Sequence, residues 1–83
     1  MNQAVGYLRE VLSNYTEGYP VGQMIYDKVK NIDFKSEQQF ARALSEQEIN
    51  FLHNILPDEI QHAHKEQDFE RAHQLNAIYE QMI

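Results

Sequence analysis

The chain has 83 residues, a formal net charge of −6 and no cysteine. This length allows one domain with one small core, and the lack of cysteine excludes disulfides, thiolate zinc sites and cysteine catalysis. Residues 36–83 carry nine acidic side chains against three Lys and Arg, which accounts for the whole net charge. No basic stripe is left to neutralise phosphates, and this argues against binding to nucleic acids or to anionic membranes.

The composition, 42% hydrophobic and 24% charged, is that of a globular protein rather than a disordered one. No apolar run approaches the ~20 residues that span a bilayer. The first ten residues lack the basic start and apolar stretch of a signal peptide. We therefore expect a cytoplasmic protein with a single domain over residues 1–83.

Apolar side chains recur every three or four residues along the chain, so helices are predicted throughout. The first helix is predicted to end at Gly18, which suits a C-terminal cap, and the second to open at Pro20. Residues 36–39 fit a capping box, in which two side chains satisfy each other's unpaired backbone donors, and residues 45–48 fit another. Two start signals so close together predict a short helix, a break and a new long helix.

The last two helices are predicted at roughly 46–66 and 69–82, with a turn at Asp68 that folds them into an antiparallel hairpin. Pro57 lies inside the first of them. Because proline removes one hydrogen bond and clashes with the preceding turn, we expect a kink near residues 53–57 rather than a break. The fold class is therefore all-α, a small bundle of about four helices. The predicted apolar face of the last helix consists of Phe69, Ala72, Leu75, Tyr79 and Met82, with Ile78 to one side.

Four histidines invite comparison with metal sites: His53, His62, His64 and His73. Glu59 and His62 have the Glu-x-x-His spacing of di-iron bundles, but such sites need the motif twice and two further glutamates. His62 and His64 are two residues apart on a helix, so they cannot hold one ion together. No nucleophile motif or glycine-rich phosphate loop occurs. We therefore expect no catalytic residue, no metal site, no cofactor and no small-molecule substrate; the chain is predicted not to be an enzyme.

Five tyrosines point instead to contacts with proteins, because tyrosine is large, fairly rigid and tolerant of partial wetting. Tyr7 and Tyr26 lie off the apolar stripes of the first two helices. Together with Tyr19 they form a candidate exposed patch. The alternative is that the two other tyrosines belong to the core and these three cover the edges of the bundle. Phe69, beside the hairpin turn, is a further candidate contact.

The C-terminal third of the chain is similar to the UVR-type helical hairpin. The residues that carry this resemblance are Ile60, Ala63, Asp68, Phe69, Glu70, Arg71, Ala72, Leu75 and Ile78. Its Asp-Phe-Glu turn has alanines on either side, which lets two helices approach closely. The resemblance implies contacts between proteins, as in DNA-repair and protease-adaptor systems.

A broader resemblance covers nearly the whole chain. It is carried by residues 6–10 (Gly-Tyr-Leu-Arg-Glu) and 12–14 (Leu-Ser-Asn), and then by Phe51, Leu52, Glu59, Ile60, Ala63, residues 66–68, Arg71, Ala72, Leu75, Asn76, Tyr79 and Glu80. In order and spacing these resemble the sigma-G-dependent sporulation-specific small acid-soluble spore protein family of Bacillus-type bacteria. The resemblance implies production inside the developing spore, hence a place in the forespore or spore interior, and solubility in acid extracts. It implies no mechanism.

Three hypotheses of function follow. The leading one is a non-enzymatic, acidic helical spore protein that serves as a protein-interaction or structural module during late sporulation. The second is a regulatory adaptor that binds one specific protein partner through the C-terminal hairpin. The third is a spore nucleic-acid-associated protein, which the missing basic stripe disfavours. Self-association as a homodimer through the N-terminal helix is a further expectation, because a domain this small gains stability from a partner.

Overall fold

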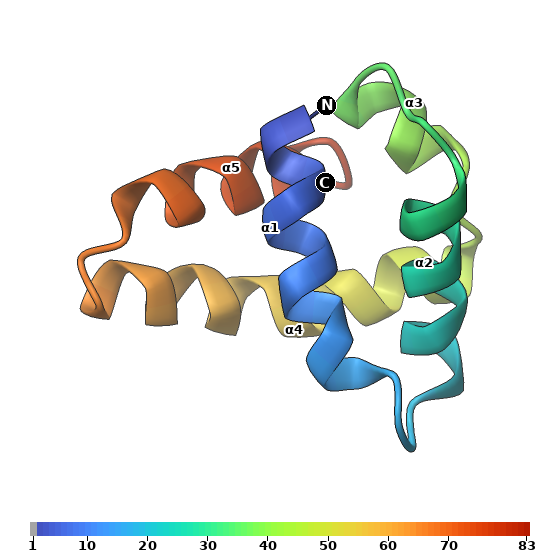
Figure 1. Ribbon diagram of the computed structural model, residues 1–83, viewed down its shortest axis with the longest axis horizontal. Helices are drawn as coiled ribbons and strands as arrows, with labels where there is room; N and C mark the ends of the chain where they lie inside the picture. The colour runs from blue at the N-terminus through green and yellow to red at the C-terminus, as the bar shows by residue number, and fades with distance from the viewer. Residues whose placement is uncertain (1) are drawn as a thin grey trace.

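Helices and short connections make up residues 2–83, the part of the chain that this computed structural model describes (Figure 1). The elements are α1 (Asn2–Leu12), the 3-10 turn η1 (Ser13–Tyr15), α2 (Pro20–Asn31), α3 (Glu37–Arg42), α4 (Glu46–Lys65) and α5 (Phe69–Glu80). No strand occurs within this range. The predicted all-α class is confirmed, with four substantial helices and the short α3.

Gly18 and Pro20 lie between the first two helices, but α1 ends at Leu12 and is followed by the 3-10 turn η1, so the helix ends earlier than the predicted end at Gly18. Gly18 adopts a φ of +82°, in the left-handed region that glycine enters without a steric penalty. Pro20 is the first residue of α2, where its missing N–H costs nothing and its fixed φ suits the helix. The turn between α1 and α2 therefore follows from local sequence alone.

Of the two predicted capping boxes, one is complete and the other is half formed. At the start of α4, the Ser45 hydroxyl accepts from the Glu48 N–H and the Glu48 carboxylate accepts from the Ser45 N–H. At the start of α3, the Ser36 hydroxyl accepts from the Gln39 N–H at 3.1 Å. The Gln39 side chain, however, accepts from the N–H of Lys35 instead of Ser36, one residue earlier than the motif requires.

The core lies between α1, α2, α4 and α5. Helix α1 packs against both α5 and α2, α2 also packs against α4, and α3 contacts α5 at one end of the bundle. The apolar side chains with no exposed surface are Leu8, Leu12, Ile25, Phe40, Leu52, Leu56, Leu75 and Ile78. Each contributes about 1.5–3 kcal/mol when fully buried, so these residues dominate the favourable side of folding.

Helices α4 and α5 form the predicted antiparallel hairpin, with the largest interface between any two helices of the described chain. Ala63 and Ala72 are each 1% exposed, and small side chains at such positions let two helix axes lie close together. Helix α4 runs through Pro57 without interruption, so the predicted absence of a break is confirmed. The kink near this proline stays a prediction.

The face that α5 buries differs from the predicted face. Ile78, placed to one side, is fully buried, whereas Phe69 is 60% exposed and Tyr79 is only half-buried. At 100° per residue, Phe69 lies at the edge of the buried face, and it is also the first residue of α5, beside the turn at the end of the hairpin. The residues buried as predicted are Ala72, Leu75 and Met82.

Candidate functional site

The turn of the hairpin is a Schellman motif centred on Gln67. The Asp68 N–H donates to the Ala63 carbonyl at 2.9 Å, and the Gln67 N–H donates to the His64 carbonyl at 3.0 Å. Gln67 has a φ of 60°, in the left-handed region that favours glycine. Asp68 then caps α5 by accepting from the Arg71 N–H at 3.2 Å. The turn lies at Asp68 as predicted and is held from both helices.

Phe69 lies beside this turn at the end of the hairpin that projects farthest from the other helices (Figure 1). Its side chain is 60% exposed, the highest exposed fraction of any aromatic residue between residues 2 and 83. The His64 ring lies 5.9 Å away, centre to centre. A large apolar side chain gains about 1.5–3 kcal/mol on full burial, so covering this ring would be favourable.

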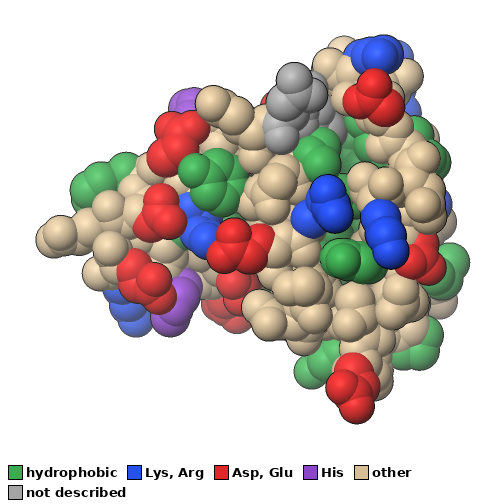
Figure 2. All heavy atoms as spheres, viewed as in Figure 1, with side chains coloured by type: hydrophobic (Ala, Val, Ile, Leu, Met, Phe, Trp, Pro, Cys, Tyr) green, Lys and Arg blue, Asp and Glu red, His purple; other side chains and the backbone are tan. Residues whose placement is uncertain are grey.

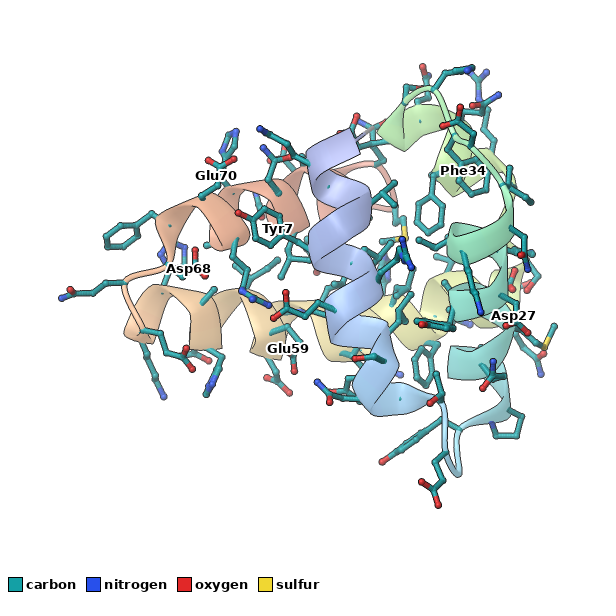
Figure 3. All side chains as sticks on the ribbon, viewed as in Figure 1. Tyr7, Asp27, Phe34, Glu59, Asp68 and Glu70 are labelled. Atoms are coloured by element: carbon teal, nitrogen blue, oxygen red, sulfur yellow. The ribbon has the colours of Figure 1, made fainter. Side chains whose placement is uncertain are left out.

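Tyr7 lies half-buried between α1 and α5, as Figure 3 shows. The guanidinium carbon of Arg71 is 5.5 Å from the centre of the Tyr7 ring, a cation–π distance. Arg71 also forms ion pairs with Glu10 on α1 and, at 3.1 Å, with Asp68. The hydrogen bond to Glu10 is the main cause that raises the pKa of Arg71. Arg71 therefore joins α1 to the start of α5.

Tyr19 belongs to an aromatic cluster just beyond the C-terminal end of α1. Its ring contacts those of Tyr15 and Phe51 edge to face, with centres 5.5 and 6.2 Å away. The Tyr15 hydroxyl donates to Glu59 on α4 at 3.2 Å. Burial, and then the negative charge of Glu59, raises the pKa of Tyr15. Tyr19 itself remains 48% exposed.

The three tyrosines of the candidate patch thus lie in different surroundings. Tyr7 contacts Arg71 of α5, Tyr19 contacts Phe51 of α4, and Tyr26 is half-buried on α2 against the core. Within the described residues no ring contact joins any two of these three. Tyr7, Tyr19, Tyr26 and Phe69 therefore remain candidate contacts, and a shared tyrosine patch stays a prediction.

Glu48 is a buried charge whose partner the sequence did not reveal. Its side chain is 1% exposed and pairs with Lys28 of α2, which also donates to the Ala43 carbonyl at 2.9 Å. Burial alone raises the pKa of Glu48, but hydrogen bonds from Lys28 and Ser45 outweigh it, so the pKa is lowered. One lysine thereby links α2 to the end of α3 and the start of α4, across 20 residues of sequence.

The histidines lie in separate places. His53 Nε2 is 2.6 Å from the Met82 carbonyl oxygen, His62 lies next to Glu66 one turn later, and His64 contacts Phe69. Between residues 2 and 83 the structure holds no group of three or more ligating side chains that could bind a metal ion. The Glu59 carboxylate, from the motif that suggested a di-iron comparison, accepts from Tyr15 instead.

The surface charge is uneven. Figure 2 shows acidic side chains gathered over the hairpin and the adjoining part of α1, whereas more of the exposed Lys and Arg on this face lie toward α2 and α3. A basic stripe of the kind that follows a nucleic-acid backbone is not visible there. As for bilayers, none of the helices over residues 2–83 has the length and apolar character needed to cross one.

Comparison with known proteins places this helical chain in a family. A family model described as minor curli fiber component A (CsgA) matches residues 1–83. That description speaks of a fiber, but the described residues contain no strand that could stack into a β-sheet fibre. The sigma-G-dependent sporulation-specific SASP protein of Bacillus subtilis (strain 168) is 40% identical over 83 residues, which is 100% of both chains. No solved structure matches. With a full-length family match and this full-length relative, the chain belongs to the same family as the sporulation-specific SASP protein.

Proposed function

We propose that this chain is a non-enzymatic protein of the spore interior that acts by contacting another protein through the tip of its C-terminal hairpin. The observation that carries the proposal is the 60% exposure of Phe69 at the end of a rigidly capped hairpin. Aromatic residues are enriched at the centres of protein interfaces, where a few such anchors supply most of the binding energy.

The rigidity of the tip adds to this argument. The Schellman motif and the Asp68 cap fix the backbone on both sides of Phe69, so little conformational entropy is lost when a partner covers the ring. Pre-organisation of this kind is typical of binding surfaces. The sporulation-specific relative supports the place and time at which the partner is met.

The non-enzymatic part of the proposal is supported by where the polar groups lie. Two of the ion pairs join helices to one another, as Arg71 does with Glu10 and Lys28 with Glu48. Each therefore has a structural role. General acid–base chemistry would need titratable groups set around a cleft with their pKa values moved apart.

The test is crosslinked capture of the tagged full-length chain from its native host in late sporulation, followed by mass spectrometry. We expect one stoichiometric protein partner for the wild type. Phe69→Ser should weaken its binding by about 2 kcal/mol, roughly 30-fold, if the ring is an interface anchor. Met24→Ser is the matched control, because Met24 is 51% exposed on α2, a helix that does not include the tip of the hairpin.

Recovery of the tagged chain alone would contradict the proposal. So would equal loss of the partner from Phe69→Ser and Met24→Ser, since a general loss of surface hydrophobicity would then explain both. Retention on DNA that decreases with added salt would favour the nucleic-acid hypothesis instead.

A further inference from the structure

A shallow groove of about 670 Å³ lies between α1 and α5, and its lining reaches Glu70, the residue next to Phe69. It is lined by Gln3, Gly6, Tyr7, Glu10 and Glu70. Figure 3 shows Tyr7 reaching from α1 toward α5, with Glu70 on the far side. The four residues from α1 are three or four apart, so they share one exposed face of that helix.

Gly6 is the unusual residue of this face. It lies in the middle of α1, where glycine destabilises a helix relative to alanine. A Cβ added at this position would meet nothing within 4 Å. No packing against the described residues therefore requires glycine here. What glycine does allow is the close approach of a second backbone to the surface of α1.

The groove has an aromatic floor and an acidic rim. Arg71 already lies over the Tyr7 ring and pairs with Glu10, which holds both side chains in place. At the other end, the Gln74 amide donates to Glu70 and to Gln3, each at 3.1 Å, and bridges α5 to α1. Glu10 and Glu70 are both exposed, so their carboxylates can accept further hydrogen bonds.

We propose that this groove docks a basic helical segment of another protein. The backbone of that segment lies across Gly6, and a Lys or Arg side chain enters between Glu10 and Glu70. This inference rests on the proposed function, because it assigns a second surface to the same interaction module and states the chemistry of the partner. Charge complementarity selects a cationic segment, since the two charged side chains that line the groove, Glu10 and Glu70, are both acidic, and the neighbouring Arg71 is already paired.

A second copy of this chain does not fit the groove in the same way. A two-fold contact would place the same surface on both sides of the interface, so an acidic rim would lie against an acidic rim. Like charges set opposite each other cost binding energy, and the net charge of −6 adds to that cost. The occupant is therefore a different, basic chain.

The test is a titration of the isotope-labelled full-length chain, followed by NMR, with an acetylated and amidated peptide of about 20 residues that repeats Ala-Ala-Ala-Ala-Lys, a length at which such peptides become helical. We expect saturable shifts confined to residues 3–10 and 69–74. A matched peptide with Glu in place of Lys should not bind. Glu70→Gln should weaken binding about three- to fivefold, the value of one exposed ion pair, whereas Glu66→Gln, the same charge change on α4, should not.

Substitutions at Gly6 distinguish a docking role of this residue from a structural one. Gly6→Ala and Gly6→Gln should raise the melting temperature or leave it unchanged, because both residues form helices better than glycine. If the groove admits a backbone, binding of the peptide should weaken in the order Gly6→Ala, then Gly6→Gln, and by about tenfold for the larger side chain.

Shifts spread over the acidic residues of α4, or equal peptide affinity for wild type and Gly6→Gln, would overturn the inference. So would a dimer of the unmixed chain that Gly6→Gln dissociates, since the occupant would then be a second copy. The proposed function is tested separately. A partner captured through Phe69 would still stand if the groove failed, and failure of capture would leave the titration result unchanged.

Discussion

The α4–α5 hairpin and the corner formed by α2 and α3 (residues 20–45) are stabilised in different ways. The hairpin buries many apolar side chains along two long helices, with Leu52, Leu56, Leu75 and Ile78 fully covered. The corner combines α2, which at 12 residues equals α5, with the six-residue α3, and individual contacts add to its packing. The Phe34 and Phe40 rings meet at 5.2 Å, and Lys28 reaches both Glu48 and the Ala43 carbonyl.

The two regions differ in how strongly the loss of a single contact should affect stability. The hairpin tolerates two local faults, a proline inside α4 and a non-glycine residue with positive φ at Gln67, because extensive apolar packing outweighs their cost. The corner also buries apolar side chains such as Ile25 and Phe40, but it contains Lys28, the partner of a buried charge, and a buried charge that loses its partner keeps its full desolvation penalty. Substitutions should therefore reduce stability strongly in the corner, and in the hairpin two of them should increase it.

The largest loss is expected for Lys28→Met. This change leaves the Glu48 carboxylate buried without a cation, which costs about 3 kcal/mol of unfolding free energy. Urea denaturation would measure it from the shift of the midpoint at unchanged slope. The control is Lys28→Met combined with Glu48→Leu, which should recover much of the loss because an apolar pair replaces the ions. An unaffected single variant would show that the corner does not depend on this pair.

Gly22→Ala should cost nearly as much, about 2–3 kcal/mol. A Cβ on Gly22 would lie 2.0 Å from the backbone oxygen of Tyr15, and backbone cannot move aside cheaply. The matched control is Gly6→Ala, where the new methyl meets nothing and a gain of about 0.5–1 kcal/mol is expected. Equal and small effects at both glycines would remove the distinction between the corner and the exposed face of α1.

Much of the hairpin could be predicted from sequence because its signals are local. Helix period, the capping box at Ser45 and the turn at Asp68 each depend on residues within four positions of one another. The contact of Lys28 with Glu48 could not be predicted, because it joins residues 20 apart and leaves no periodic trace. Glu48 was recognised only for its bond to Ser45.

The candidate surfaces could be predicted in part. Phe69 and Tyr7 stood out by residue type and position. Which face of α5 is buried, however, depends on where α1 and α4 pack. As a result Ile78 is buried and Phe69 is exposed, the reverse of the predicted placement. The sequence did not single out Gly6 as a surface residue of interest. Its meaning emerged only once the space above it was known to be open.

Pro57→Ala tests the hairpin side of the comparison and should stabilise the chain by about 2 kcal/mol. Alanine restores the N–H that can donate to the carbonyl of His53 and removes the clash of the proline ring with that turn. Pro57 is exposed, so little packing is lost with the ring. The urea midpoint should rise. A fall would mean that the predicted kink at Pro57 is needed for α4 to fit against its neighbours.

Acid should weaken the corner through Glu48. The pKa of this carboxyl is lower in the folded chain than its ordinary value of 4.5, so its contribution to stability is complete above about pH 5 and is lost as the pH falls through the folded pKa. Unfolding free energies measured between about pH 6 and 3 should show this decline. In Glu48→Gln no proton is taken up at this position, so the unfolding free energy should decline less steeply as the pH falls. The variant should nevertheless be less stable than the wild type at neutral pH. Identical slopes would contradict the assignment.

The smallest expected effect is a gain of about 1 kcal/mol for Gln67→Gly. Gln67 holds a φ of 60° at the position of a Schellman motif that glycine occupies without steric strain. The gain is limited because glycine also has more conformational freedom in the unfolded chain. Thermal unfolding should show a higher midpoint, with Gln81→Gly, at a residue with an ordinary helical φ of −73°, as the control that loses stability. If Gln67→Gly also destabilises, the glutamine side chain contributes contacts that the strain argument omits, and the tip that presents Phe69 is held by more than its backbone hydrogen bonds.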